Sequence, residues 1–325
     1  MSDFISTTSP KLLQLVVSVP LFFLIIGLLF FIAGKANGKK QRPLAIAVFV
    51  GPAFILLATG LVVPAIRTLL FSFMDPDSLK FVGLRNYNWM VHDPNVHIIL
   101  RNTVLWILFV PLVTTGIGLL LAILLDRMKR ETIPKSLIFM PMAISFVGAS
   151  IIWKFVYEYK SPDQPQIGLL STLVHMIGFG PSNWMLTKPL NTFLLMIIFI
   201  WTQTGFAMVI LSAAIKAVPA DIVEASALDG AFGRKLFRFI TFPMVRSTFI
   251  VVLATQVVGS LKLFDIVRTM TGGNFGTNVL ANEMYSQVFV QFDQGKGSAL
   301  AVALFICVTP ILTYNIIHLR RERQH

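Results

Sequence analysis

Residues 219–243, PADIVEASALDGAFGRKLFRFITFP, form a long charged interval between apolar segments of this sequence. Its acids come before its bases, and small or apolar residues separate them. Such a mixture suits noncovalent binding, and three kinds of partner are possible: DNA, an anionic membrane or another protein. The charged residues are Asp221, Glu224, Asp229, Arg234, Lys235 and Arg238.

The first half of this interval predicts a short helix. Pro219 fits the first helical turn, where its missing N–H has no intrahelical partner. Asp221 and Glu224 follow near the helix start, where acids interact favourably with the positive end of the helix dipole. Gly230 is placed to end the helix, because glycine adopts the left-handed conformation that commonly follows a last turn.

The second half predicts another short helix over residues 231–241, and Pro243 is expected to break it before the next apolar segment. The bases share one face of this helix, and apolar residues recur at helical spacing on the opposite face. These apolar residues are Phe232, Leu236, Phe239 and Ile240.

The helix–glycine–helix outline resembles a DNA reader, but flanking membrane spans would keep its second helix out of a groove, so we expect no nucleic acid partner. An amphipathic helix lying on anionic lipid remains an alternative. The third interpretation is a docking element for a cytoplasmic protein. Small residues at Ala225, Ser226 and Gly230 would allow the close approach that docking needs.

Signals for other chemistry are absent from the sequence. The five histidines lack metal-ligand spacing, and the single cysteine, Cys307, allows no internal disulfide, so no metal site is expected. The glycine–lysine pairs at 34–35, 38–39 and 295–296 lack the P-loop pattern G-x-x-x-x-G-K-[ST]. We find neither a G-x-S-x-G motif nor paired carboxylates within the apolar segments. The chain is therefore not expected to be an enzyme or to bind a cofactor itself.

The composition indicates a membrane protein. Of the 325 residues 55% are hydrophobic and 13% charged, and the mean hydropathy is +0.77. A soluble domain of this size needs a larger charged fraction, so the bilayer is the expected solvent. The formal charge of +12 sits in short clusters between apolar runs, as membrane topology produces.

Seven apolar segments are long enough to span a bilayer, which requires about 20 residues. The predicted fold is thus an all-α membrane protein with about seven transmembrane helices. We expect residues 1–43 to form an extra N-terminal helix with a basic linker, and residues 44–325 a six-helix transmembrane domain. The segments are 12–33, 44–70, 98–125, 136–157, 191–214, 247–267 and 297–318.

The distribution of basic residues predicts the orientation. More than half of the 27 lysines and arginines fall in segments 34–43, 126–135 and 215–246 and in the C-terminal tail. Because cytoplasmic loops carry the excess of positive charge, the N-terminus is expected outside and the C-terminus in the cytoplasm. The interval 219–243 would then lie on the cytoplasmic side.

The sequence E-A-S-A-L-D-G-A, followed by F-x-x-I-T-F-P, resembles the cytoplasmic loop of permease subunits of binding-protein-dependent ABC importers. Ser226 replaces the usual alanine and Phe242 the usual leucine, and both substitutions keep size or hydrophobicity. In that family the loop is the coupling helix, which inserts into a cleft of the ATPase subunit. The matching residues are Glu224, Ala225, Asp229, Gly230, Ile240 and Pro243.

A second block, residues 265–305, resembles the last outer loop and final helix of maltose-type sugar permeases, especially those for α-glucosides and disaccharides. Segments F-V-G-L-R-N-Y (81–87) and R-N-T (101–103) also match, and the resemblance covers roughly residues 44–320. It implies a multi-pass protein of the bacterial inner membrane that forms half of a sugar pore. Trehalose, maltose, sucrose and glucosylglycerol are all candidate substrates.

The resemblance also implies partners. These are a second homologous permease, a cytoplasmic ABC ATPase dimer that binds ATP and Mg, an extracytoplasmic solute-binding protein, the sugar and membrane lipid. The alternative is a secondary transporter or channel for a small polar solute, working without an ATPase. That alternative predicts midplane carboxylates or an internal repeat, and we find neither in the sequence.

A sugar crossing the pore needs hydrogen-bond partners and aromatic surfaces, because unpaired polar groups are costly in a low dielectric. Polar residues within the apolar segments could supply them, but they could equally join helices by hydrogen bonds. Lys262 lies three residues from Asp265 and could pair with it instead of binding substrate. The candidate pathway residues are Asn102, Trp201, Gln203, Gln256, Ser260 and Lys262.

Overall fold

The computed structural model describes residues 41–322 except positions 127, 162, 179 and 181. It also describes residues 17–34 except 19, 25, 29, 32 and 33. The regular elements among these residues are helices, and the single β-bridge, between Met74 and Phe81, is isolated. The predicted all-α class is confirmed. The chain divides into two units, Met1–Arg67 and Thr68–His325, and the predicted boundary between residues 43 and 44 falls inside the first.

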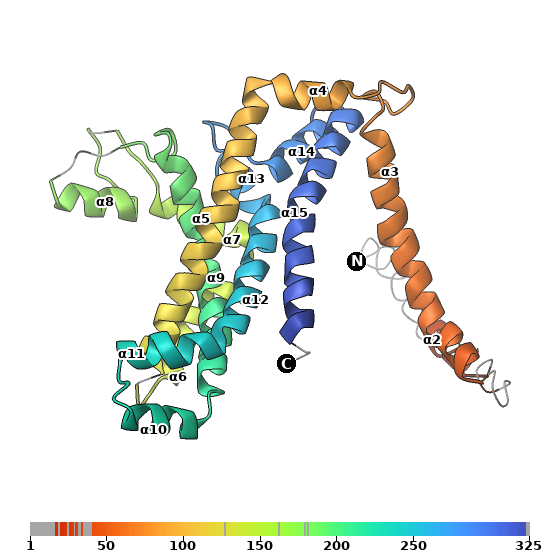
Figure 1. Cartoon of the computed structure of the whole chain (residues 1–325). Helices are drawn as coiled ribbons and strands as arrows, with labels where there is room; N and C mark the ends of the chain where they lie inside the picture. Colours follow the sequence, from red (N-terminus) through yellow and green to blue (C-terminus); the bar gives the residue numbers. More distant parts are fainter. Residues whose placement is uncertain are drawn as a thin grey trace, which may run out of the picture. The chain divides into compact units, whose positions relative to one another are not determined.

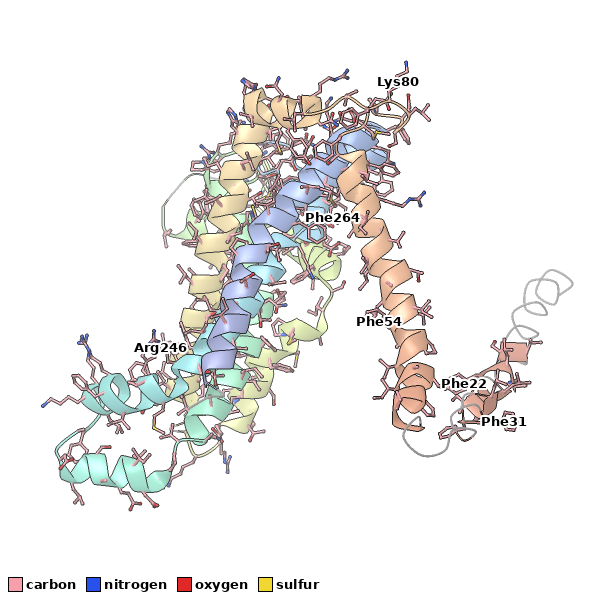
Figure 2. All side chains as sticks on the ribbon, turned by 45° about the vertical axis from the view of Figure 1, so that its right-hand side comes forward. Phe22, Phe31, Phe54, Lys80, Arg246 and Phe264 are labelled. Atoms are coloured by element: carbon pink, nitrogen blue, oxygen red, sulfur yellow. The ribbon has the colours of Figure 1, made fainter. Side chains whose placement is uncertain are left out.

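A long helical run begins at Gln41 among the described residues of the first unit. It consists of α2 (Gln41–Leu57), a π-helical turn η2 (Ala58–Val62) and the start of α3 (Val63–Phe71). Large apolar side chains such as Phe54 project outward from α2 and are exposed (Figure 2). Outward apolar side chains without protein contacts are what a lipid-facing helix presents.

The second unit is built around α5 (Pro94–Leu125), α9 (Leu190–Lys216) and α12 (Phe242–Leu261), which pack against one another. A Cβ on Gly118 of α5 would lie 2.6 Å from the Ala207 Cβ and 2.9 Å from the Met208 nitrogen of α9. The two helix backbones therefore meet where small residues allow close approach, as in membrane helix pairs.

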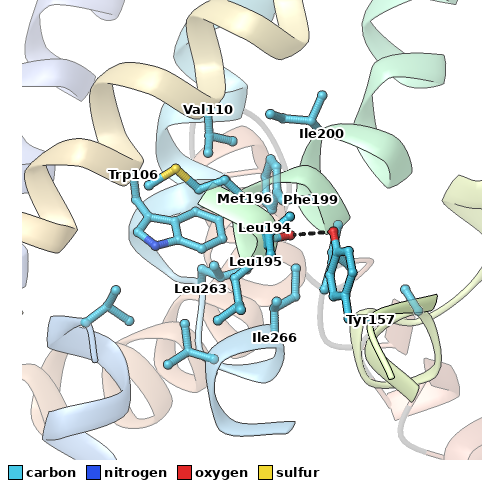
Figure 3. Packing of buried hydrophobic residues seen from close by; sticks show 14 of the residues in the cluster. Trp106, Val110, Tyr157, Leu194, Leu195, Met196, Phe199, Ile200, Leu263 and Ile266 are labelled. Carbon is cyan, nitrogen blue, oxygen red and sulfur yellow. Dashed lines mark hydrogen bonds between the residues drawn. The ribbon is translucent and has the colours of Figure 1, made fainter. Parts of the chain in front are cut away.

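The largest core cluster lies in this unit (Figure 3). The Trp106 and Phe199 rings meet edge to face with centroids 6.5 Å apart, and Leu195 and Ile266 are fully buried beside them. Tyr157 Oη donates a hydrogen bond of 2.9 Å to the Leu194 carbonyl oxygen. This bond satisfies the one polar atom of a buried aromatic side chain.

The segment predicted as one span over residues 136–157 is broken. It forms α6 (Thr132–Phe139), a 3₁₀ turn η3 (Met140–Ala143) and α7 (Phe146–Val156), bent by 103°. Pro141 lies at the start of the 3₁₀ turn, and the Ser145 hydroxyl accepts a hydrogen bond from the Gly148 N–H to begin a new helix. Proline and an N-capping serine thus override the apolar run that predicted a single helix.

The predicted break at Pro243 is wrong. The short α11 (Arg234–Leu236) and a π-helical turn η4 (Phe237–Thr241) run directly into α12, giving a helix from Arg234 to Leu261. A proline clashes with the carbonyl four residues earlier, and here the π-helical turn covers that position. The same arrangement occurs in the first unit, where η2 precedes Pro64.

The same helix also ends earlier than predicted, at Leu261 instead of residue 267, and the chain restarts as α13 (Asp265–Met270). Lys262 and Asp265 therefore lie on either side of a helix break. They form no ion pair in the described structure, so the expected pairing is wrong.

Short helices close both ends of the second unit. Figure 1 shows α4 (Arg85–His92), α14 (Leu280–Phe289) and the start of α15 (Gln294–Glu322) at one end. At the other end lie α10 (Ala220–Leu228), α11 and the start of α6. The remaining short helix is α8 (Leu169–Met176). The charged interval identified in the sequence is thus at the opposite end of the bundle from α4 and α14.

Among the described residues, four helices are long and apolar enough to cross a membrane, or five if the bent α6–α7 pair is one span. The predicted last span, 297–318, lies within α15. The predicted first span, 12–33, falls partly outside the described residues, and those described between 17 and 34 are helical. The count of seven and the orientation of the termini stay predictions.

Candidate functional site

Helix α10 forms where the sequence predicts a short helix, but Pro219 is its N-cap residue and not part of its first turn. Pro219 precedes its first residue, and Asp221 lies in the first turn. The Gly230 N–H donates to the Ala227 oxygen at 3.0 Å and the Ala231 N–H to the Ser226 oxygen at 2.9 Å. With Gly230 at a φ of +76°, these bonds form the Schellman motif that ends many helices. The prediction that Gly230 ends the helix is confirmed.

The motif residues of this segment divide by exposure. Five of them are exposed: Glu224, Ala225, Asp229, Gly230 and Pro243. Ser226 is buried, and its hydroxyl donates to the Ile222 carbonyl oxygen, while Ile240 is half-buried. Leu228, which the sequence analysis did not single out, is 91% exposed. A large apolar side chain held open at a helix end is a common feature of protein-binding surfaces.

In the second half of the segment, the apolar residues face other directions than predicted. Phe232 and Phe239 are 66% and 67% exposed. Phe237 and Phe242 instead contact each other, with ring centroids 5.8 Å apart and planes tilted by 52°, and pack on the core cluster between α5 and α9. The π-helical turn contains an extra residue, so it rotates the apolar face relative to a regular helix. Phe237 and Phe242 hold the segment to the bundle and leave Phe239 outside.

The charged residues of this segment are available for a partner. The ion pairs found among the described residues include none of Glu224, Asp229 and Arg238. The Arg238 guanidinium carbon lies 6.0 Å from the centroid of the exposed Phe239 ring. Apolar and charged groups are therefore presented together at this end of the bundle.

An ion-pair network lies next to the segment. Lys135 on α6 pairs with Asp126 and, at 2.7 Å, with Glu131, and Lys216 at the end of α9 pairs with Glu131. The Ser212 hydroxyl donates to Asp126 at 2.6 Å. The network ties the α5–α6 connection to the last turns of α9, three residues before Pro219. The sequence analysis missed it, although the i,i+4 spacing of Glu131 and Lys135 was a usable signal.

The network shifts the titration of Glu131. Hydrogen bonds from the ammonium groups of Lys135 and then Lys216 lower the pKa of the Glu131 carboxyl to about 2. The carboxylate therefore stays ionised well below the ordinary range of a glutamate, and the tie between α6 and α9 persists in acid.

The structure does not bring the six pathway candidates together. Asn102 is buried, and its Nδ2 donates to the carbonyl oxygens of Gly276 at 2.6 Å and Asn278 at 3.0 Å. Both bonds hold a loop, so its contacts favour the packing alternative. Ser260 is buried too, and its hydroxyl donates to the Val257 oxygen of its own helix at 2.9 Å.

Gln256 differs from these two residues. It is 2% exposed, and its Nε2 has no hydrogen-bond partner in the described part of the chain. A buried amide nitrogen without a partner is costly, so it calls for a water or a ligand. Of the six candidates, Gln256 keeps the clearest unused hydrogen-bonding capacity.

The remaining three candidates do not line a common cavity. Trp201 meets Trp153 edge to face at 5.7 Å and, with Thr204, lines an apolar cavity of about 440 Å³ beside the α6–α7 break. Gln203 is half-buried and is not among the residues lining that cavity. Lys262 is exposed and lines a second apolar cavity, of about 670 Å³, between α12, α14 and α15. Within the described residues no cluster of three or more histidine, cysteine or acidic side chains could hold a metal ion.

Comparison with known proteins gives a consistent result. Residues 114–323 match the family model described as binding-protein-dependent transport system inner membrane component. The osmoprotective compounds uptake permease protein GgtC of Synechocystis sp. is 46% identical over 82% of this chain and 96% of its own length. The alpha-glucoside transport system permease protein AglF of Rhizobium meliloti is 43% identical over 89% of this chain and 88% of its own length.

A similar fold occurs in a solved structure. The crystal structure of a bacterial ABC transporter involved in the import of the acidic polysaccharide alginate matches with a TM-score of 0.75. The match covers 86% of this chain and 96% of that one, at 17% identity. At this identity the similarity concerns the fold alone.

Proposed function

The chain belongs to the family of binding-protein-dependent transport system inner membrane components, and from this premise we propose that it forms half of the pore of an ABC sugar importer. The chain is a multi-pass membrane transport component. In the proposal a second, homologous permease supplies the other half of the pore. A cytoplasmic ATPase dimer, which holds ATP and Mg, drives transport, and an extracytoplasmic binding protein delivers the sugar.

The single observation that carries the ATPase contact is the surface of residues 219–243. Leu228 is 91% exposed, and Phe232 and Phe239 are exposed on the same segment beside unpaired charges. Such side chains gain free energy only when a partner covers them, at roughly 25 cal/mol per Å² of apolar surface. We assign this segment as the docking element for the ATPase.

The link from docking to the pore runs through α12. Because α11, η4 and α12 are continuous, a displacement of residues 234–241 moves the helix that carries Gln256 and Ser260. Phe237 and Phe242 anchor the same helix against α5 and α9. Closure of the ATPase dimer would then bias the pore between two conformations, which is coupling in the thermodynamic sense.

The proposed substrate is an α-glucoside or a related small, uncharged glycoside. Two of the similar proteins carry names that concern alpha-glucosides and osmoprotective compounds. Calorimetry of the cognate binding protein against trehalose, maltose, sucrose and glucosylglycerol would identify the compound. Failure of every α-glucoside in that panel to bind would contradict the assignment.

The docking assignment is tested by Leu228→Asp in the assembled complex. Because this side chain is almost fully exposed, the change should leave the fold intact. The ATPase should no longer co-purify with the permease, and sugar uptake should be lost. The matched control is Leu79→Asp, at a leucine that is 79% exposed in the connection before α4. Normal ATPase association and uptake in the Leu228→Asp complex would overturn the docking role.

A further inference from the structure

The second unit contains a polar cavity of about 510 Å³ at the end of the bundle opposite α10. Its walls come from α4, the first turns of α5, residues 273–278, α14 and the start of α15, which Figure 1 shows gathered at that end. Its size falls in the range of small-molecule sites, about 300–1,000 Å³. None of the six residues predicted to line the pathway belongs to its wall.

One wall carries an unused hydrogen-bond acceptor. Gln287 is 3% exposed, and its Nε2 donates to Glu283 at 2.7 Å. Its Oε1 is buried and has no donor among the described residues. The other oxygen of Glu283 accepts from Asn278 Nδ2, also at 2.7 Å. These bonds fix the orientation of the amide and leave its oxygen for a hydroxyl donor from a ligand.

The charges of the wall balance. Two acids, Asp93 and Glu283, line the cavity together with two cations, Lys188 and Lys296, and several uncharged amides. A wall with acids and bases in equal number favours neither an anion nor a cation. It offers both donors and acceptors, which is the requirement of an uncharged compound with many hydroxyl groups.

An aromatic ring completes the site. The Trp89 indole lines the cavity, and its Nε1 donates to Asp93 at 2.9 Å, which holds the ring in place. The Lys296 ammonium lies 5.0 Å from the centroid of the Trp89 ring and 3.2 Å from the Asp293 carboxylate. The indole has a fixed orientation and the Lys296 ammonium lies over its ring, so this part of the wall would offer a sugar both apolar ring surface and a charged donor.

The loop that forms the back wall is held by distant contacts. Asn102 bonds the Gly276 and Asn278 oxygens, and the Leu280 N–H donates to the Thr103 hydroxyl at 3.0 Å. Gly273 has a φ of +87°, and a Cβ there would lie 2.5 Å from the Asn282 Nδ2. The wall is therefore preformed, which reduces the entropy that binding must overcome.

We propose that this cavity is a saccharide-binding site, separate from the pathway through the helices, which holds an uncharged mono- or disaccharide at the mouth of the transporter. The inference rests on the proposed function, since it places the site where the binding protein would release its sugar. The wall supplies acceptors from Gln287 and Glu283, donors from the lysines and an aromatic surface from Trp89.

The test uses the complete importer in nanodiscs without its binding protein. Trehalose, maltose and sucrose are titrated into the complex while its intrinsic tryptophan fluorescence is measured. The part of the fluorescence change that is lost in the Trp89→Phe variant is the part that comes from the cavity. We expect saturable binding reported by Trp89. Glucose 6-phosphate, an anionic probe, should not compete.

Two variants locate the binding. Gln287→Met removes the free acceptor, and Gln291→Trp fills the cavity from an exposed wall position without breaking a hydrogen bond of the described structure. Each should weaken saccharide binding about fivefold or more, the effect of one lost hydrogen bond or of a blocked site. Gln294→Met and Gln294→Trp are the controls, because this exposed glutamine does not line the cavity.

The outcomes separate this proposal from the proposed function. If the wild-type complex imports an α-glucoside but Trp89 reports no saccharide, the cavity proposal alone is overturned. Unchanged saccharide affinity together with weakened binding-protein association in both variants would also overturn it, and would make the cavity a protein-docking surface. A Trp89-reported saccharide signal in a complex that imports no sugar would support the cavity and refute the proposed transport function.

Discussion

Gly230 is required by the conformation of the backbone and not by a lack of space for a side chain. Its φ of +76° closes α10, yet a Cβ built there meets no atom within 4 Å. Any substitution therefore acts through conformational strain and through what it presents to a partner. For residues with a β-branched side chain, a left-handed backbone costs roughly 1–2 kcal/mol.

We expect Gly230→Val to lower uptake and ATPase stimulation at least tenfold, because the turn between α10 and α11 must change. Gly230→Asn is the matched control, since asparagine tolerates the left-handed conformation. Assays in proteoliposomes measure sugar uptake and ATPase stimulation for each variant. Equal, normal coupling in the two variants would show that this turn does not transmit the ATPase movement.

Glu131 is the residue whose charge state joins α6 to α9. Its pKa is lowered from 4.5 to about 2 by Lys135 and Lys216. A carboxyl with a lowered pKa in the folded state stabilises that state above its ordinary pKa and loses this contribution as the pH falls towards the lowered value. The stabilisation is thus complete at neutral pH and declines below about pH 4.5.

The Glu131→Gln variant should therefore have a lower melting temperature than the wild type at pH 7. The difference should shrink steadily between pH 5 and pH 3, as followed by thermal unfolding in detergent. Asp77→Asn, at an exposed acid outside the described ion pairs, should match the wild type throughout. A difference that does not depend on pH would mean that packing, and not charge, explains the effect.

Among the elements, the α5–α9 pair determines the shape of the bundle. Gly118 has no room for a Cβ beside Ala207, whereas Gly116, two residues away on α5, has no atom within 4 Å of that position. Close backbone approach between these helices is therefore needed on one face of α5 only. Association of membrane helices depends on such close packing, because lipid is as apolar as the side chains.

Gly118→Ala should destabilise the protein by about 1–3 kcal/mol, the typical cost of overpacking. Gly116→Ala should be neutral or slightly stabilising, because alanine is the better helix former. The two midpoints of thermal unfolding in the same detergent give the comparison. Similar midpoints would show that α5 and α9 separate easily at Gly118.

The two π-helical turns form a second feature at the scale of elements. Each ends two residues before a proline, at Val62 before Pro64 and at Thr241 before Pro243. A wider turn moves the carbonyl that the proline ring would meet, so the helix continues across a residue that usually interrupts it. In α12 this continuity joins the proposed docking segment to the membrane helix.

At the scale of the whole molecule, the unit Thr68–His325 contains the matched family region 114–323 together with α10, α12 and the polar cavity. Its described core clusters consist of residues of this unit alone. We therefore expect the N-terminal segment to be dispensable for assembly.

Residues 1–43 are removed and replaced by a new initiating methionine. The shortened chain should still co-purify with the partner permease and the ATPase, and both the yield of this complex and sugar uptake should stay within about twofold of the wild type. A C-terminal tag measures the amount in the membrane, so that reduced expression is not mistaken for lost activity. Loss of assembly at equal membrane level would show that this segment belongs to the transport core.

The sequence alone determined the features that depend on neighbouring residues. Apolar runs identified the helices now seen as α5 and α9, and Pro219 and Gly230 defined α10, because capping and turn chemistry act within a few residues. The motif around Glu224 likewise indicated the family before the fold was known.

Only the tertiary structure decided the features that depend on residues far apart. Asn102 bonds carbonyl oxygens of residues 174 and 176 positions away, so its contact with this loop has no local signal in the sequence. The polar cavity is formed by α4, α5, α14 and α15 together with residues 273–278, and Phe237 and Phe242 pack against residues of α5 and α9 that lie far away in the sequence. Local sequence specifies where a helix can begin and end, but the side chains that face each other across the bundle are set by packing between distant segments.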